Sequence, residues 1–232
     1  MTDTIFERLR GKFLVFDGVD GAGKGAQLKL LHDGLTAHGV DVVTTRDPGG
    51  TIIGDRIRHV LLDYDLSEMD VRCETFLFMA SRAQLARDVI SPALLKKVAC
   101  LGDRYVSATC AYQGAAGYDP HRVVEVARFA IDDVWPHLTI IIDMPPDDAF
   151  KRTGRKTGGR RKNNGGEGQP KLFHDVDTDA MEARPLEFHR RVRDLFLELP
   201  DYYPAPVTVV DGIGSVEQVQ ARVMEALSSA AL

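Results

Sequence analysis

Short apolar runs alternate along this chain with longer stretches in which apolar residues recur every three or four positions. The short runs, which are rich in β-branched residues, span 13–16, 40–44, 98–101, 138–142 and 207–210. They predict the strands of a parallel sheet that is buried on both faces. The periodic stretches predict helices over 23–37, 52–62, 67–90, 120–131, 147–155, 179–199 and 215–227, with Ser67 and Ser215 as N-caps. This alternation predicts an α/β fold, a five-stranded parallel sheet flanked by helices on both faces.

Charged residues follow the predicted strands. Because parallel strands joined by right-handed crossovers end at one edge of the sheet, ligands of such folds bind beyond the carboxyl ends of the strands. We therefore expect one rim to gather the charged residues that come directly after the first four strands: Asp17, Arg46, Asp47, Asp103, Arg104 and Asp143.

The segment between the first strand and the first long helix carries a phosphate-binding pattern. It reads Gly18-Val19-Asp20-Gly21-Ala22-Gly23-Lys24, which is G-x-x-x-x-G-K in its proper strand-to-helix context. Glycines allow successive backbone N–H groups to turn toward an anion, and Lys24 adds a positive charge near the β- and γ-phosphates. We expect residues 18–26, through Gly25 and Ala26, to bind ATP in a P-loop of the nucleoside triphosphatase type.

One position departs from that pattern. The Ser or Thr that usually follows the lysine and supplies a hydroxyl to Mg²⁺ is replaced by Gly25, with Ala26 after it. Either the loop binds phosphate without turnover, or phosphates, waters and carboxylates hold the magnesium, which suits an ion that keeps several waters. Lys24-Gly25 resembles the loops of adenylate kinases, and we favour an active enzyme.

Composition narrows the class of protein. The chain has 232 residues, 44% of them hydrophobic, which is enough for one domain with a substantial core. Its formal charge of −5 argues against non-specific nucleic-acid binding. The three cysteines, Cys73, Cys100 and Cys110, have no metal-like spacing and indicate free thiols in a reducing cytoplasm, with Cys73 and Cys100 expected in the core. No apolar run is long enough to span a membrane.

A basic segment interrupts the acidic chain. Residues 151–171 contain eight Lys or Arg side chains and one acid, diluted with Gly and Asn. This composition suits a solvated, disordered loop. It also suits a mobile lid that brings arginines to a transferring phosphoryl group, and we place such a lid at 151–178 within a single domain spanning 1–232.

Further motifs occur in a specific order. Thr45-Arg46-Asp47-Pro48-Gly49-Gly50-Thr51 follows the second strand, Phe76 to Arg82 lies on a long helix, and Gly102-Asp103-Arg104-Tyr105 precedes Ala111-Tyr112-Gln113-Gly114. Together with the phosphate loop, this set resembles the thymidylate kinase family from about Lys12 to Leu199. The resemblance implies phosphoryl transfer from ATP with Mg²⁺ to dTMP, in a homodimer. Together with the composition, it leads us to expect a cytoplasmic protein that engages neither nucleic acid nor membrane.

The resemblance also assigns roles to residues of the acceptor site. Arg46 and Arg104 match the pair that grips the acceptor phosphate, and Asp20 matches the residue that holds the sugar 3′-hydroxyl and helps to organise magnesium. Phe78 matches the ring that stacks on the base, and Arg82 the donor to thymine O4. The remaining expected substrate contacts are Pro48, Thr109 on the other edge of the base, Tyr112 against the 2′ position, and Gln113.

Taken without the family, several of these residues have plainer interpretations. Phe78 would be a core residue, Arg82 a surface arginine and Tyr112 a half-buried tyrosine. Asp17 suits either a magnesium contact or a structural cap on the loop. Asp103 suits either the magnesium shell or a partner that holds Arg104, and we favour the second, keeping Asp103 beside Asp20 as a possible metal ligand.

The family takes its catalytic arginine from the phosphate loop or from the lid. Gly21 stands at the loop position, so the lid is expected to supply it from Arg152, Arg155, Arg160 or Arg161, and we favour Arg155 and Arg160. A further departure is Ala180, where a family arginine often follows the acid. The apolar helix at 71–90 could supply the dimer interface.

Three alternatives remain open at this point. The nearest is a kinase for another nucleoside monophosphate, with dUMP the closest competitor because it shares the O4 acceptor. The second is a catalytically impaired nucleotide-binding homologue, supported by Gly25, Ala26 and Ala180. The third, a nucleic-acid-binding module built on the basic segment, is disfavoured because no aromatic residues are interleaved with the cations.

Overall fold

A five-stranded parallel sheet organises the protein. The computed structural model describes residues 2–62, 69–154 and 184–232. Its strands are β1 (Phe13–Asp17), β2 (Val42–Arg46), β3 (Ala99–Asp103), β4 (Leu138–Asp143) and β5 (Val207–Asp211), in the spatial order β2-β3-β1-β4-β5. Every adjacent pair is parallel, so the predicted sheet is confirmed.

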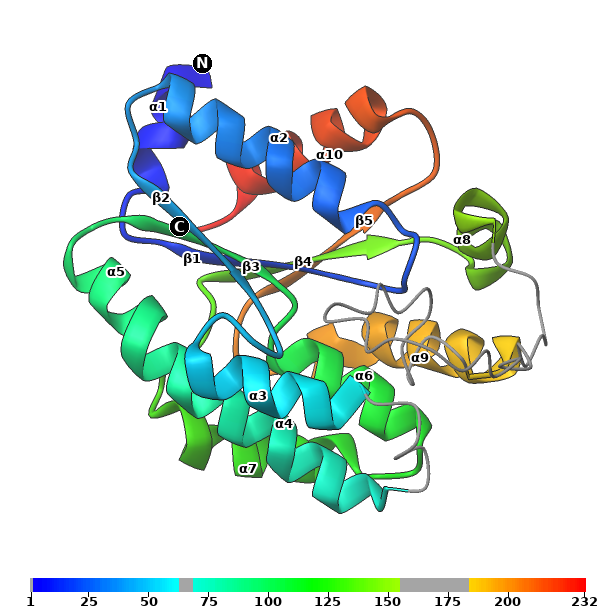
Figure 1. Ribbon diagram of the computed structural model, residues 1–232. Helices are drawn as coiled ribbons and strands as arrows, with labels where there is room; N and C mark the ends of the chain where they lie inside the picture. The colour runs from blue at the N-terminus through cyan, green and yellow to red at the C-terminus, as the bar shows by residue number, and fades with distance from the viewer. Residues whose placement is uncertain (1, 63–68, 155–183) are drawn as a thin grey trace, which may run out of the picture.

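Helices cover both faces of the sheet (Figure 1). One face carries α1 (Thr2–Arg8), α2 (Lys24–Ala37) and α10 (Val216–Ser229). The other layer contains α4 (Val71–Leu85), α5 (Ser91–Leu95), α6 (Val106–Ala115), α7 (Pro120–Ile131) and α9 (Leu186–Glu198), and α3 (Ile52–Leu62) packs on α4. The short α8 (Pro146–Thr153) follows β4 and packs on α9.

Burial explains which strands are uninterrupted apolar runs. Every residue of β1 is buried, as are nearly all of β3 and β4, because these central strands have helices on both faces. The outer strands β2 and β5 are partly exposed, so the expectation of burial on both faces holds only for the centre of the sheet. The central core gathers side chains such as Phe13, Phe16 and Leu101.

Three helices in the described ranges were not predicted: α1, α6 and α5, which continues the helix predicted to end at residue 90. α6 lacks amphipathic periodicity because it is buried on nearly every side, including its polar residues Ser107, Thr109 and Gln113. α1 is only seven residues long, too short for a clear period, and it is fixed by the burial of Ile5 and Phe6.

Helix boundaries also differ from the prediction. The helix predicted to begin at Ser67 begins at Val71, because the Asp70 side chain accepts a hydrogen bond from the Arg72 N–H and caps it; Ser67 lies outside the described residues. A π-helical turn at Ala86–Ile90 continues this helix into α5. Ser215 caps α10 as predicted, in a capping box with Gln218.

The exposure of Cys73 corrects a prediction. Cys73 lies on an exposed side of α4 rather than in the core, whereas Cys100 and Cys110 are buried, and all three are free thiols. Within the ranges that the structure describes, no helix has the length and apolar character that crossing a membrane would require.

Candidate functional site

The phosphate-loop motif forms a tight turn between β1 and α2. Gly23, at the N-cap of α2, has a left-handed backbone (φ 99°), and a side chain on Gly18 (φ 130°) would place its Cβ 2.4 Å from the Ile142 carbonyl oxygen. Both positions therefore require glycine. The loop and the N-terminus of α2 supply backbone N–H groups of the kind that bind phosphate.

Lys24 lies folded over this loop. Its Nζ donates to the carbonyl oxygens of Gly18 and Val19, each at 3.0 Å, and stands 3.7 Å from the Asp20 carboxylate. Burial, together with the neighbouring Arg104 guanidinium, lowers the pKa of Lys24, and the Asp20 carboxylate opposes that shift. The lysine is thus placed at the loop that the motif predicts.

Arg104 is the centre of a charged cluster beside the loop. One guanidinium nitrogen donates to Asp17 Oδ1 at 3.0 Å, and the other donates to Asp20 Oδ1 and to the Tyr112 hydroxyl at 3.2 Å. The Tyr112 hydroxyl donates to Asp20 Oδ2 at 2.8 Å, and its ring lies under the Arg104 guanidinium. Although burial opposes its charge, Asp20 and Asp17 hold the pKa of Arg104 well above its ordinary value.

The two aspartates beside Arg104 have different surroundings. Asp17 is fully buried, accepts hydrogen bonds from Ser107 Oγ at 2.7 Å and from the Gly18 N–H at 3.0 Å, and thus caps the loop as one of its two interpretations expected. Asp103 was favoured as the partner that holds Arg104; its negative charge is among those that raise the pKa of Arg104, but the hydrogen-bond partners of the guanidinium are other residues. In the described part of the chain, Asp17, Asp20 and Tyr112 take this role.

Arg82 is buried rather than on the surface. Its side chain is 1% exposed, Nε donates to Asp47 Oδ2 at 2.5 Å, and a terminal nitrogen donates to Thr109 Oγ1 and to the Tyr105 carbonyl, both at 3.1 Å. The structure therefore brings together Arg82 and Thr109, two predicted base contacts. Burial raises the pKa of Asp47, and the Arg82 guanidinium opposes that shift.

Phe78 and Gln113 lie on the same two helices. Phe78 is buried on α4 one turn before Arg82, as its core interpretation also allows. Gln113 is buried on α6 one turn after Thr109, and its Nε2 donates to Glu74 Oε2 at 3.3 Å. Glu74 in turn accepts a hydrogen bond at 3.2 Å from Arg184, which lies two residues before the start of α9.

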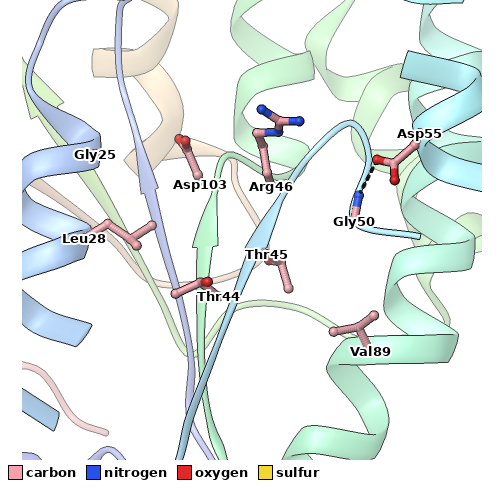
Figure 2. A pocket seen from close by; sticks show the side chains of 9 residues that line it. All are labelled: Gly25, Leu28, Thr44, Thr45, Arg46, Gly50, Asp55, Val89 and Asp103. Carbon is pink, nitrogen blue, oxygen red and sulfur yellow. Dashed lines mark hydrogen bonds between the residues drawn. The ribbon is translucent and has the colours of Figure 1, made fainter. Parts of the chain in front are cut away.

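A cavity of about 460 Å³ opens at the carboxyl end of β2. Figure 2 shows Arg46 and Asp103 pointing toward the same rim, with Gly50 donating its N–H to Asp55. The cavity is lined by Gly25, Leu28, Thr44, Thr45, Arg46, Gly50, Asp55, Val89 and Asp103. Arg46 and Asp103 are register neighbours on β2 and β3, so the cavity adjoins the rim that Arg104 occupies.

The segment after Arg46 forms a tight turn. Pro48 follows a cis peptide bond, and its carbonyl oxygen accepts a hydrogen bond from Arg58 at 2.9 Å. The Gly49 N–H donates to Ser81 Oγ at 3.1 Å, which ties the turn to α4.

Of the four arginines expected to serve as a catalytic arginine, only Arg152 is described. Its guanidinium lies over Gly23, since a Cβ on that glycine would be 3.3 Å from a terminal nitrogen of Arg152. The favoured Arg155 and Arg160 lie outside the described residues, as do Arg161, Ala180 and most of the predicted lid.

Carboxylates at this rim suit a magnesium ion that is held mainly by phosphates. The described residues contain no group of three or more His, Cys, Asp or Glu side chains that could enclose a metal. Asp20 lies in the phosphate loop and Asp103 at the edge of the neighbouring cavity. One or two carboxylates are what Mg²⁺ uses when nucleotide phosphates and waters complete its shell, so the residues fit the ion.

The sequence missed two residues that support the site, Ser107 and Glu74, which hold Asp17 and Gln113. Asp47 was expected at the rim, but its pairing with Arg82 was not. The only available signal was position: Glu74 precedes Phe78 and Arg82 at four-residue intervals on one helix face, and Ser107 follows the D-R-Y motif.

Comparisons with known proteins agree on one family. The family model described as thymidylate kinase matches residues 16–223. The chain is 37% identical to a thymidylate kinase of Kosmotoga olearia over 92% of this chain and 93% of that protein. It is 38% identical to one of Desulfosudis oleivorans over 93% and 95%. The crystal structure of thymidylate kinase from Ehrlichia chaffeensis matches with a TM-score of 0.68 at 27% identity, covering 94% of this chain and 98% of that one.

Proposed function

The chain belongs to the thymidylate kinase family, and from this premise we propose which of its residues carry out the transfer of the ATP γ-phosphoryl group to dTMP. The enzyme produces dTDP and ADP. The observation that supports our assignment best is the cluster of Arg104 with Asp17, Asp20 and Tyr112, directly beside the phosphate loop.

We assign the ATP phosphates to residues 18–26. The loop N–H groups and the α2 N-terminus contact the phosphates, and Lys24 leaves the Gly18 and Val19 carbonyl oxygens to pair with them. Arg152, which lies over Gly23, is placed to add a further cation on this side. Arg155 and Arg160 remain predictions as catalytic arginines, in a lid at 151–178 of the single domain.

We assign the dTMP phosphate to Arg104 and Arg46. A guanidinium donates two parallel hydrogen bonds to phosphate oxygens, which fixes the acceptor in line with the donor. Asp20 and Tyr112 orient Arg104 from the other side. We assign the sugar 3′-hydroxyl to Asp20, which is a residue of the phosphate loop itself. Tyr112 presents the ring that would crowd a ribose 2′-hydroxyl.

We assign the thymine base to the region between α4 and α6. Phe78 offers its ring for stacking, Arg82 donates to O4, and Thr109 and Gln113 supply polar contacts. Pro48, in the turn that Arg58 and Ser81 fix, closes the site from the β2 side. An O4 acceptor is common to thymine and uracil, so this assignment favours dTMP and dUMP over dCMP and AMP.

Catalysis in this arrangement is positioning together with charge neutralisation. The dTMP phosphate is already an anionic nucleophile at neutral pH, so no strong general base is needed. Arg104 and Arg46 hold the acceptor oxygens, while Lys24 compensates the negative charge of the donor phosphates. Asp20 and Asp103 are the residues we expect to hold Mg²⁺, which supplies further charge neutralisation when it is bound with ATP.

We also propose a homodimer in a reducing, cytoplasmic compartment. The dimer proposal rests on exposed apolar residues of neighbouring helices, Ile53 and Val60 on α3 and Phe76 on α4. The compartment proposal rests on the three free thiols.

The decisive experiment is a coupled ADP-release assay with ATP, Mg²⁺ and dTMP, with dUMP, dCMP and AMP as parallel acceptors. We expect turnover that prefers dTMP, and a Lys24→Ala variant that keeps its fold but loses most of its kcat at saturating substrates. Turnover that prefers another nucleotide would replace the substrate assignment. ATP binding without turnover for any acceptor would favour the catalytically impaired homologue, and an unchanged kcat in Lys24→Ala would contradict the role of the loop.

A further inference from the structure

Two antiparallel helices, α4 and α6, carry matching rows of polar side chains. Glu74, Phe78 and Arg82 follow one another at four-residue intervals and so share one face of α4. At one end of this row Arg82 donates to Thr109, and at the other end Gln113 donates to Glu74. Phe78 lies between the two polar pairs.

The side-chain amide of Gln113 is buried, and only its NH₂ group forms a hydrogen bond in the described ranges. The residue is 1% exposed, and its Nε2 donates to Glu74 Oε2 at 3.3 Å. Its Oε1 is buried and accepts no hydrogen bond from any residue in the described ranges. A buried amide oxygen without a donor is costly, and its position beside the base-binding residues points to a donor supplied by the ligand.

Glu74 determines which atom of the Gln113 amide remains without a hydrogen-bond partner. An ionised carboxylate only accepts hydrogen bonds, so the Gln113 NH₂ must face Glu74 and Oε1 must face away. The other carboxylate oxygen of Glu74 accepts from Arg184 at 3.2 Å, and the Arg184 guanidinium lies 4.8 Å from the Phe188 ring centroid. Burial raises the pKa of Glu74, while the charge of Arg184 opposes that shift.

The orientation of this amide matters for the choice of base. A 4-oxo pyrimidine presents an acceptor at O4 and a donor at N3–H. Cytosine presents a donor at its 4-amino group and an acceptor at N3. A donor from Arg82 to O4 together with an acceptor from Gln113 to N3–H complements the first pattern and opposes the second.

We propose that Glu74 is a positioning residue that fixes the Gln113 amide with Oε1 toward the N3–H of a 4-oxo pyrimidine, and thereby makes the site discriminate against cytosine nucleotides. This inference rests on the proposed function, since it concerns the base of the same acceptor. Glu74 acts through Gln113 and contacts no substrate atom itself.

The test is the isosteric change Glu74→Gln, with kcat and KM measured for dTMP and dCMP. An amide at position 74 can present either its oxygen or its NH₂, so the Gln113 amide is no longer held in one orientation. We expect the ratio of kcat/KM for dTMP to that for dCMP to fall by about tenfold, the usual effect of one hydrogen bond. The change is expected mainly in the KM for dTMP, with kcat little altered.

The swapped pair Glu74→Gln with Gln113→Glu is the matched control. A carboxylate at position 113 is an acceptor in either orientation, so the swap is expected to restore much of the lost discrimination. A merely structural role for Glu74 would lower the melting temperature in both variants without moving the ratio. A folded Glu74→Gln protein with the wild-type ratio would overturn the proposal.

If Glu74→Gln does not fold, Glu74→Asp gives the answer by the same ratio. Aspartate keeps the charge near Arg184 but is one methylene shorter, too short to reach a nitrogen already at 3.3 Å. A folded Glu74→Asp protein with wild-type discrimination would overturn the proposal, and a reduced ratio would support it. Wild-type turnover of dTMP is measured first, because its absence would contradict the proposed function rather than the role of Glu74.

Discussion

At the scale of single residues, the ion pair of Arg82 with Asp47 is the most consequential contact in the proposed acceptor site. Both side chains are 1% exposed, so neither charge is solvated by water. Asp47 comes from the turn after β2 and Arg82 from α4, so this pair joins two elements that we assign to the base-binding site. Breaking a buried pair by removing one partner leaves an uncompensated charge in the core.

We therefore expect Asp47→Ala to be strongly destabilising. The loss should amount to about 3–5 kcal/mol of unfolding free energy, measured by urea denaturation, because Arg82 remains buried without its carboxylate. The matched control is Asp148→Ala, which removes an exposed carboxylate paired with Lys151 and should leave the midpoint nearly unchanged. Equal effects of the two changes would show that the Arg82 pair contributes little to stability.

Gly25 is a residue where sequence and structure together make a test possible. It lies in the first turn of α2, and a Cβ built on it meets no atom within 4 Å. Alanine or serine should therefore fit without strain. Because glycine is unfavourable inside helices, Gly25→Ala should stabilise the protein by about 0.5–1 kcal/mol.

The pair Gly25→Ser and Gly25→Ala separates the hydroxyl from helix propensity. Only serine restores the side-chain oxygen that usually contacts magnesium after the loop lysine. We expect Gly25→Ser alone to lower the Mg²⁺ concentration that gives half-maximal activity. If both variants shift the magnesium dependence equally, the missing hydroxyl is not what distinguishes this loop.

At the scale of secondary-structure elements, the sequence predicted those strands and helices that a continuous apolar run or a clear apolar period reveals. The central strands β1, β3 and β4 were found because burial on both faces makes them continuous apolar runs. α6 was missed for the same physical reason, since a helix that is buried all round has no polar face to reveal its period. The start of α4 was placed early because the cap is Asp70, which sequence alone did not single out.

The candidate site was predictable wherever a motif fixes a backbone shape or follows a strand. Lys24, Arg46 and Arg104 are examples. Partners across the fold were not predictable: nothing local in the chain connects Asp47 with Arg82, 35 positions later, or Ser107 with Asp17. Cys73 was misplaced because its apolar neighbours in sequence point to other sides of the helix.

Two arginines on α9 connect this helix to the end of β4 and to α8. Arg193 makes a bidentate contact with Asp143, at the end of β4, with distances of 2.7 and 2.8 Å. Arg190 contacts Asp147 of α8 and is more exposed. The Arg193 contact holds α9 against the end of β4, and the Arg190 contact holds α9 against α8.

Their different burial predicts different effects on stability. We expect Arg193→Met to cost about 1 kcal/mol, which lowers the melting temperature by about 2–4 °C for a chain of this size. Arg190→Met should leave the melting temperature unchanged, since solvent screens its contact. Differential scanning calorimetry of both variants checks this, and a larger shift for Arg190→Met would reverse the assignment.

At the scale of the whole molecule, large apolar side chains remain on the surface of the α3, α4 and α7 layer. Phe76 is 57% exposed and Phe129 is 96% exposed. Ile53 and Val60 lie two turns apart on α3 and project from one side of it. Surfaces of this kind commonly mark contacts between proteins, which is the basis of the proposed dimer.

The three cysteines provide a probe of that surface. Burial raises the pKa of both Cys100 and Cys110 to about 12, so these thiols stay protonated and inaccessible at pH 8. Cys73 is exposed and lies one turn before Phe76 on α4. We expect a thiol reagent to modify only Cys73 in the native protein and all three cysteines after unfolding.

A dimer formed through Phe76 would shield Cys73, so its labelling rate should rise as the protein is diluted through the dissociation range. The Phe76→Ser variant should elute as a monomer in size-exclusion chromatography, and its Cys73 should be labelled at the same rate at every protein concentration.

The control is Ile213→Ser, which removes a similarly exposed apolar side chain (54%) after β5. β5 is the strand at the opposite edge of the sheet from β2. A labelling rate that is independent of concentration in the unmodified chain, together with monomeric elution, would contradict the dimer. Dimerisation that survives Phe76→Ser but not Ile213→Ser would move the interface to the β5 edge.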